Sequence, residues 1–218
     1  MPRLVFGPCL ALVLIAASAA PASAQLVPGR IPPVVFDVRG FWPGLGQDPV
    51  TASDLDLLAT DLPSRGLGAV TGVHVYPIRR GRFALGAGGE LIVARGNRDP
   101  IVVEGSEAPV GPTVHQRLQG FSAQVSLNFG NEDGWSYLTG GMGPMRFGTY
   151  TGDTAPAEAA PSKSTINLGG GARWFFKRHL AFTFDVRFYL TRPEVRTELY
   201  PGRGRSRLLV LSAGIAIK

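Results

Sequence analysis

The sequence predicts an all-β fold, an eight-stranded antiparallel up-and-down barrel that crosses a membrane. Apolar residues recur at every second position along much of the chain, and the connections between these segments alternate between long and short. Glycine (29) and proline (18) are abundant among the 218 residues, which disfavours long helices and suits strands joined by turns. With 44% hydrophobic and 17% charged residues, the chain has too much apolar material for a disordered protein.

The first residues predict a cleaved signal peptide. Arg3 precedes the apolar stretch Leu10–Ala17, and Ala22-Ser23-Ala24 before Gln25 is the small-x-small pattern of a signal peptidase site. Beyond this segment no apolar run approaches the roughly 18 residues of a membrane helix. The predicted divisions are a signal peptide (1–24), a short periplasmic lead (25–33) and an outer-membrane barrel domain (34–218).

The cysteine content and the net charge limit which kinds of site and which partners this protein can have. Cys9 is the only cysteine and lies in the predicted signal peptide, so we expect no disulfide and no thiolate metal site in the mature chain. The formal net charge is +6, and losing Arg3 leaves +5. A basic exported protein favours anionic lipid over nucleic acid as its partner, and we expect no nucleic-acid binding.

Eight candidate strands show the period-two alternation. They lie near residues 34–42, 66–76, 82–94, 116–129, 135–148, 164–176, 180–191 and 206–217. Most have about nine residues or more, the length of a tilted strand that crosses a bilayer.

The connections between these strands alternate in length. Long segments (43–65, 96–115, 149–163, 192–205) alternate with tight ones (77–81, 130–134, 177–179). Outer-membrane barrels have short periplasmic turns and long external loops, whereas a soluble sandwich has no reason to sort its loops in this way.

The two faces of the strands differ in polarity. One face is apolar along every strand and is predicted to contact lipid. It includes Phe36, Val125, Phe182, Phe184 and Leu211, and on the fifth strand Trp135, Tyr137, Met145 and Phe147. The other face carries His74, Gln124, Ser126, Ser136 and Asn167 together with seven charged residues. An inward polar face with an outward apolar band is the outer-membrane arrangement.

The seven charged residues of the inner face are predicted to form a paired interior network. They are Asp37, Arg39, Glu90, Arg146, Arg173, Asp185 and Arg187. An unpaired buried charge costs several kcal/mol, so each one needs a partner, although the sequence does not assign the pairs. Because side chains fill an eight-stranded barrel, we favour this network over an ion or proton path.

Aromatic residues near predicted strand ends suggest two interfacial girdles. Trp42, Tyr76, Tyr150 and Trp174 belong to this group. The alternative interpretation is that aromatic residues favour strands in general.

One hairpin carries a family resemblance. The segment Gly169–Phe176, a short basic turn and the segment Ala181–Tyr189 resemble the sixth and seventh strands of small outer-membrane barrels of the OmpA/OmpX type. The resemblance implies location in the outer membrane of a Gram-negative-type bacterium and the barrel-assembly machinery as a partner during biogenesis. It implies no activity. The chain ends in Ile217-Lys218, whereas the family usually ends in an aromatic residue.

We expect no enzymatic activity, no metal and no cofactor. His74, His115 and His179 lack the close spacing of a metal site. A lipid-modifying barrel enzyme remains an alternative. It would need a serine, a histidine and an acid placed together, and the least unfavourable set is His115, Ser122 and Glu104, with Ser122 facing inward. A soluble secreted lipid-binding barrel is the other alternative, and it predicts an apolar interior.

Several arginines extend the outward rows at the end with the long loops. They are Arg65, Arg95, Arg117, Arg192, Arg203, Arg205 and Arg207. Arginine is tolerated near the membrane interface, and its guanidinium binds phosphate in a bidentate manner. This predicts a rim that contacts lipopolysaccharide phosphates or other anionic outer-leaflet groups, with solvated loop-base charges as the alternative. The leading hypothesis is a monomer that displays four external loops in an envelope-structural, adhesive or protective role.

Overall fold

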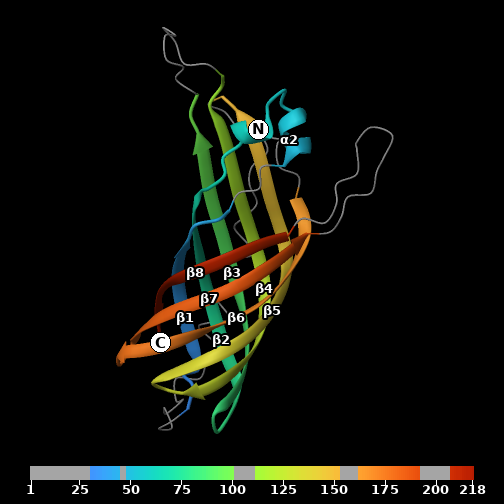
Figure 1. Ribbon diagram of the computed structural model, residues 1–218. Helices are drawn as coiled ribbons and strands as arrows, with labels where there is room; N and C mark the ends of the chain where they lie inside the picture. The colour runs from blue at the N-terminus through green and yellow to red at the C-terminus, as the bar shows by residue number, and fades with distance from the viewer. Residues whose placement is uncertain (1–29, 45–47, 101–110, 153–161, 192–206) are drawn as a thin grey trace, which may run out of the picture.

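The computed structural model describes residues 30–44, 48–100, 111–152, 162–191 and 207–218. Within them, eight antiparallel strands form a closed barrel in which each strand pairs with its neighbours in sequence and β1 pairs with β8 (Figure 1). The strands are β1 (Val34–Phe41), β2 (Leu67–Arg80), β3 (Phe83–Arg98), β4 (Val114–Asn131), β5 (Gly134–Thr151), β6 (Ser162–Lys177), β7 (Leu180–Thr191) and β8 (Arg207–Ile217). The predicted all-β, eight-stranded barrel is confirmed.

Tight turns join the strands at one end of the barrel. Gly81 begins the β2–β3 turn with φ +59°, a left-handed conformation that glycine adopts without strain. In the β4–β5 turn the side-chain Oδ1 of Asn131 accepts hydrogen bonds from the backbone N–H groups of Asp133 (3.0 Å) and Gly134 (3.2 Å). The C-terminus lies at this same end (Figure 1). These contacts fix short hairpins at the positions where the sequence predicts tight connections.

The connection from β1 to β2 lies at the opposite end and folds over the barrel. It contains α2 (Pro49–Ser53) and the 3-10 helix η1 (Ala59–Asp61) (Figure 1). The Asp48 carboxylate caps α2 by accepting a hydrogen bond from the backbone N–H of Thr51 at 3.1 Å. Ala52 and Leu62 are buried in one cluster with Val114 at the start of β4. This segment therefore packs on the barrel through its own small apolar core. No helix among the described residues is long and apolar enough to span a bilayer.

The interior is layered, as the inward positions of β1 show. Val35 belongs to an apolar cluster near the tight turns, Asp37 and Arg39 to a charged layer, and Phe41 to a second apolar cluster toward the long connections. The order repeats along β7, from Ala181 through the charged layer to Tyr189. The barrel is therefore filled by alternating apolar and ionic layers.

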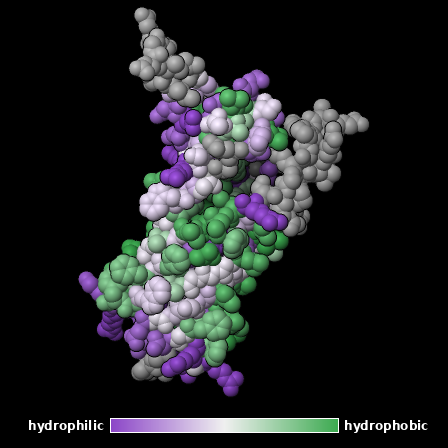
Figure 2. All heavy atoms as spheres, viewed as in Figure 1, coloured by the Kyte–Doolittle hydropathy of each residue, from purple (hydrophilic) through white to green (hydrophobic). Residues whose placement is uncertain are grey.

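The outer face is apolar around the middle of the barrel. Phe36, Val125, Phe182 and Leu211 are between 53% and 67% exposed, and they come from four different strands. Figure 2 shows hydrophobic side chains concentrated in the middle of the face in view and hydrophilic ones mainly toward its two ends. The polarity of the two faces follows the prediction on all strands except β5.

On β5 the predicted orientation is wrong over most of the strand. Trp135, Tyr137 and Met145 are buried in the interior, and Ser136 is exposed on the outer face. Trp135 stacks on Phe175 with ring centroids 5.3 Å apart, so the lumen supplies the apolar contacts that a large aromatic residue needs. Phe147, the fourth apolar residue expected to face outward on β5, is 38% exposed, but its register partner on β4 is the inward Leu118, so it belongs to the inward row as well.

The aromatic residues suggested as girdles divide between the two faces. Trp42 and Trp174 are exposed on the outside, whereas Tyr76 and Tyr150 are buried. Tyr76 packs edge-on against Trp135 in the apolar cluster near the tight turns. Tyr150 is also buried, but it packs against His115 and Arg117 on the outer side of the barrel. Of these four aromatic residues, Tyr76 therefore lies in the interior and the other three lie on the outer side.

Candidate functional site

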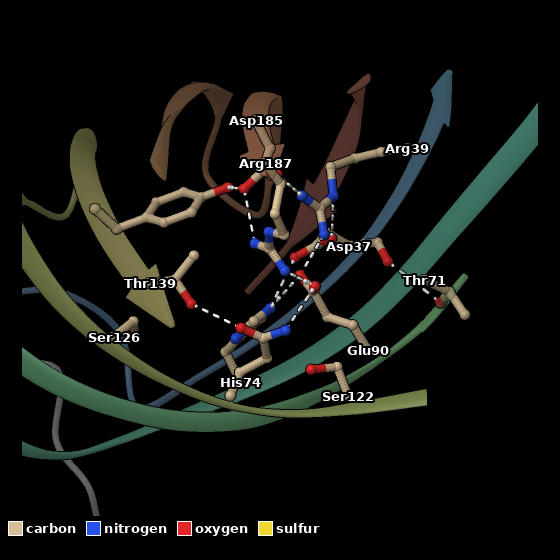
Figure 3. A network of polar contacts seen from close by, with 12 residues as sticks. Asp37, Arg39, Thr71, His74, Glu90, Ser122, Ser126, Thr139, Asp185 and Arg187 are labelled. Carbon is tan, nitrogen blue, oxygen red and sulfur yellow. Dashed lines mark hydrogen bonds and ion pairs between the residues drawn. The ribbon is translucent and has the colours of Figure 1, made fainter. Parts of the chain in front are cut away.

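The centre of the barrel holds a buried ionic network (Figure 3). Three arginines and three carboxylates from β1, β3, β6 and β7 form it, and each is 2% exposed or less. Its members are Arg39, Arg173, Arg187, Asp37, Glu90 and Asp185. The three positive and three negative formal charges cancel, which allows the group to be buried without a net charge. These are six of the seven residues predicted for the interior.

Arg39 is the hub of this network. Its Nε lies 2.8 Å from Oδ1 of Asp37, two residues before it on the same inward row of β1. Its Nη1 lies 3.1 Å from Oδ1 of Asp185 on β7, and its Nη2 contacts Glu90 on β3. One guanidinium therefore connects three carboxylates from three strands, which uses the planar fork geometry that arginine provides.

The other two arginines complete the neutralisation of the carboxylates. Arg187 contacts Glu90 through Nη1, and its Nη2 lies 2.8 Å from Oδ2 of Asp185. Arg173 reaches Oδ2 of Asp37 at 2.6 Å, and its guanidinium lies 4.5 Å from the ring centroid of Tyr137. Each carboxylate therefore contacts two arginines, and the network links β1 with β3, β6 and β7.

Neutral side chains extend the network on the β4–β6 side. Gln124 donates to Glu90 Oε2 at 3.2 Å and to Asn167 Oδ1 at 3.0 Å, and Asn167 in turn donates to the Ser122 hydroxyl at 2.6 Å. The Tyr137 hydroxyl donates to Asp185 Oδ2 at 2.9 Å. A cavity of about 10 Å³ lies beside these groups, which is room for about one water molecule. This cavity is too small for an organic substrate.

Glycines on the inner face make room for these large side chains. A Cβ placed at Gly171 would lie 2.6 Å from the Tyr137 hydroxyl and 2.1 Å from the backbone oxygen of Phe184. Neither contact is sterically possible without movement of the wall. Tyr137 therefore reaches Asp185 only because β6 lacks a side chain at this position.

Among the residues that the structure describes, Asp37, His74 and Glu90 form the group that could hold a metal ion. One ligand atom from each lies within 4.8 Å of the others. However, Asp37 and Glu90 each contact two arginines in the network, so guanidinium groups already supply the positive charge that a cation would bring. His74 lies 3.4 Å from Asp37 and 3.6 Å from Glu90 through Nε2. This geometry favours an ion-pair network with His74 at its edge over a metal centre.

Arg146 does not belong to the interior network, contrary to the sequence prediction. It is exposed on the outer face of β5, where it pairs in register with Gln119 of β4 and Ser162 of β6. The physical reason is the inverted orientation of β5. Once Tyr137 and Met145 face inward, every residue at an even position of this stretch, Arg146 included, faces outward.

The predicted rim arginines that the structure describes are exposed. Arg65, Arg95, Arg117 and Arg207 all lie toward the end with the long connections. Arg95 and Arg117 are direct partners across β3 and β4, and the Arg117 guanidinium lies 5.3 Å from the ring centroid of Tyr150. Arg192, Arg203 and Arg205 lie outside the described residues.

The structure separates the residues considered for lipid-modifying catalysis. His115 faces the outer side near the rim, where its Nδ1 is 2.9 Å from Oδ1 of Asn97. Ser122 faces inward and accepts its hydrogen bond from Asn167. Glu104 lies outside the described residues. The barrel wall therefore stands between the histidine and the serine, and these two do not form a nucleophile–base pair.

The sequence prediction missed Tyr137 and Trp135 as interior groups. A period-two pattern cannot separate the two faces when both carry apolar residues, as on β5. The outward row of this strand carries two large apolar residues, Leu138 and Met142, with Ser136, Gly140 and Pro144 between and beside them, so it does not stand out from the inward row. The signal available was chemical: a buried tyrosine needs a polar partner, and Asp185 on the inner face is the acceptor for Tyr137.

The barrel is similar to solved structures of bacterial surface proteins. The crystal structure of Neisserial surface protein A (NspA) has a TM-score of 0.52 and 12% identity, and the similarity covers 87% of this chain and 99% of that chain. The crystal structure of Ail, the attachment invasion locus protein of Yersinia pestis, has a TM-score of 0.45 and 11% identity over the same shares. No protein-family model and no curated protein matches the sequence. The likeness to NspA confirms the predicted resemblance to small outer-membrane barrels at the level of the fold.

Proposed function

We propose that this protein is an integral outer-membrane barrel that anchors and displays four external loops without catalysing a reaction. The observation that carries the proposal is the polarity of the two faces: charged side chains fill the centre, and apolar side chains cover the outside of every strand. A monomer in water rarely exposes an apolar patch larger than a few hundred Å². A continuous apolar band around eight strands is stable where acyl chains surround it.

The loop lengths support an orientation in this membrane. The tight turns and the C-terminus would face the periplasm, and the long connections would face outward (Figure 1). Export by a cleaved signal peptide over residues 1–24 and insertion by the barrel-assembly machinery are parts of the same proposal. Closure of β1 on β8 leaves no free strand edge, which supports a monomer.

The exposed arginines support a contact with the outer leaflet. Arg65, Arg95, Arg117 and Arg207 lie at the end proposed to face outward, where lipopolysaccharide or other anionic lipids carry phosphate groups. An arginine near the interface costs about 0 to 1 kcal/mol, against roughly 2 to 4 kcal/mol at the midplane. The barrel would thus be fixed by its apolar band and by phosphate contacts above this band.

The biological role proposed for the loops is structural, adhesive or protective. The β1–β2 connection is a folded element that packs on the barrel through Ala52, Leu62 and Val114, so it presents a defined surface. NspA, to which the barrel is similar, is by its name a surface protein of Neisseria. Together with the absence of a substrate-sized cavity next to the described polar network, this supports display rather than turnover.

Labelling of single cysteines on intact cells tests the proposed orientation. Thr60 in η1 and Arg82 in the β2–β3 turn are both exposed and lie at opposite ends of the barrel. A membrane-impermeant maleimide should label Thr60→Cys on whole cells, and should label Arg82→Cys only after the outer membrane is permeabilised. Labelling of Arg82→Cys on intact cells, or recovery of the protein in the soluble fraction, would contradict the proposal.

A further inference from the structure

Three arginines come together on the outer face of three neighbouring strands. Arg95 on β3 is the direct register partner of Arg117 on β4. Arg117 pairs with Gly148 on β5, and Arg146 lies two residues before Gly148 on the same face. Directly opposed residues have Cβ atoms about 5 Å apart, and diagonal neighbours about 7 to 8 Å. The three guanidinium groups can therefore converge on one anionic group.

This arginine cluster, Arg95, Arg117 and Arg146, has no acidic counterpart among the described residues. None of the three makes an ion pair with a described carboxylate, in contrast to the interior arginines. Apart from one another, the register partners of the three arginines are uncharged: Leu67 is opposite Arg95, and Gln119 and Ser162 are opposite Arg146. Like charges directly opposite each other destabilise a sheet. The cluster is therefore a surface that gains from an external anion.

The surroundings of the cluster fit an amphiphilic anion. Toward the middle of the barrel the same outward rows continue with Val93 on β3, Phe121 on β4 and Met142 on β5, all exposed. An anionic head over the arginines would place an attached acyl chain on this apolar surface. The ring of Tyr150 packs beside the Arg117 guanidinium and holds it at the rim.

We infer that Arg95, Arg117 and Arg146 form a defined binding site for a phosphate group of an outer-leaflet lipid, rather than three separate members of a diffuse basic rim. The inference rests on the proposed function, because it needs the β3–β5 face to lie in the outer leaflet. Guanidinium groups bind phosphate oxygens through paired N–H donors, so two or three forks enclose one phosphate. The lipid binds at a fixed place on the barrel, below the β3–β4 and β5–β6 connections.

Binding of diphosphoryl lipid A to the full-length folded barrel tests the inference. The barrel is refolded in zwitterionic detergent micelles, and lipid A is titrated while the bound complex is counted by native mass spectrometry. Each charge-assisted hydrogen bond contributes about 1.5 to 3 kcal/mol, so Arg117→Gln and Arg146→Gln should each weaken binding about tenfold or more. Lipid A without its phosphates should bind equally weakly to wild type and variants, and inorganic phosphate alone should bind less tightly than the lipid.

Arg178→Gln is the matched control variant. Arg178 is exposed in the β6–β7 turn, at the end of the barrel opposite the cluster. The same loss of one charge there should change binding less than threefold. Arg207→Gln, on β8 and outside the cluster, should weaken binding less than Arg117→Gln does. Equal losses in Arg117→Gln and either of these two variants, or no loss in either cluster variant, would overturn the inference. Heat-modifiable gel migration shows that each variant is folded, and the Thr60 and Arg82 labelling shows separately whether the barrel is in the membrane.

Discussion

At the scale of single residues, the barrel is held together by charges that lie far apart in the sequence. Arg173 and Asp37 are separated by 136 positions and meet at 2.6 Å. Removing one partner of a buried ion pair leaves the other charge uncompensated, and this costs more than the intact pair contributes to stability. Neutralising a single member of the network should therefore lower the free energy of unfolding strongly.

Glu90→Gln is the sharpest test of the network. Glu90 contacts both Arg39 and Arg187 and accepts from Gln124, so the substitution leaves two buried guanidinium groups with one negative partner fewer. We expect a loss of about 3 to 5 kcal/mol in the free energy of unfolding. Urea unfolding in lipid vesicles, followed by tryptophan fluorescence, measures it. Glu132→Gln, the same chemical change in the β4–β5 turn, should stay within about 0.5 kcal/mol.

The sequence places six of the seven predicted charges on the inner face, but it does not identify their pairs. The parity of β1 and β7 is clear because Phe36 and Phe184 alternate with Asp37 and Asp185. The pairs depend on how far each strand is shifted when the barrel closes. Arg39 contacts Asp185 because β1 closes the ring beside β8 and β7, and no local pattern encodes that register.

At the scale of elements, β5 shows where a period-two pattern fails. Its two faces carry apolar residues in turn, Trp135 and Tyr137 on one side and Leu138 and Met142 on the other. Register with β4 decides between them, because Tyr137 is opposite the inward Asn128. The wrong prediction that Arg146 faces the interior follows directly from the orientation of this one strand. The other strands were predicted well because their inner faces carry charge or glycine.

An arginine on the outer face of β4 tests whether lipid surrounds the barrel. Val125 is 67% exposed near the middle of the strand, so an arginine there would sit in the acyl-chain region of a membrane. Val125→Arg should cost about 2 to 4 kcal/mol of unfolding free energy in vesicles, and Thr151→Arg at the rim of β5 about 0 to 1 kcal/mol. Equal costs at the two positions, measured by the same unfolding assay, would indicate that the outside of the barrel is not in lipid.

At the scale of the whole molecule, the layered interior determines what the barrel can transport. The two apolar clusters close the lumen on either side of the ionic layer, with Tyr76 and Trp135 near the tight turns and Phe41 and Leu118 toward the long connections. Each of these four side chains is 3% exposed or less. An ion would have to displace packed aromatic rings and then break the contacts of Arg39 with three carboxylates.

We therefore expect no stepwise conductance from the protein in planar lipid bilayers. Water-filled lumens occur in barrels of about 16 strands, whereas an eight-stranded barrel is just wide enough for side chains to fill it. A porin reconstituted in the same bilayers is the positive control for insertion and recording. Side chains in the lumen, rather than the loops, block the path through the barrel. A variant without the β1–β2 connection should therefore also show no conductance. Stepwise conductance of the intact protein would contradict this expectation and show that ions pass through the ionic layer. Substitution of Arg39 would then be the first test of how they pass.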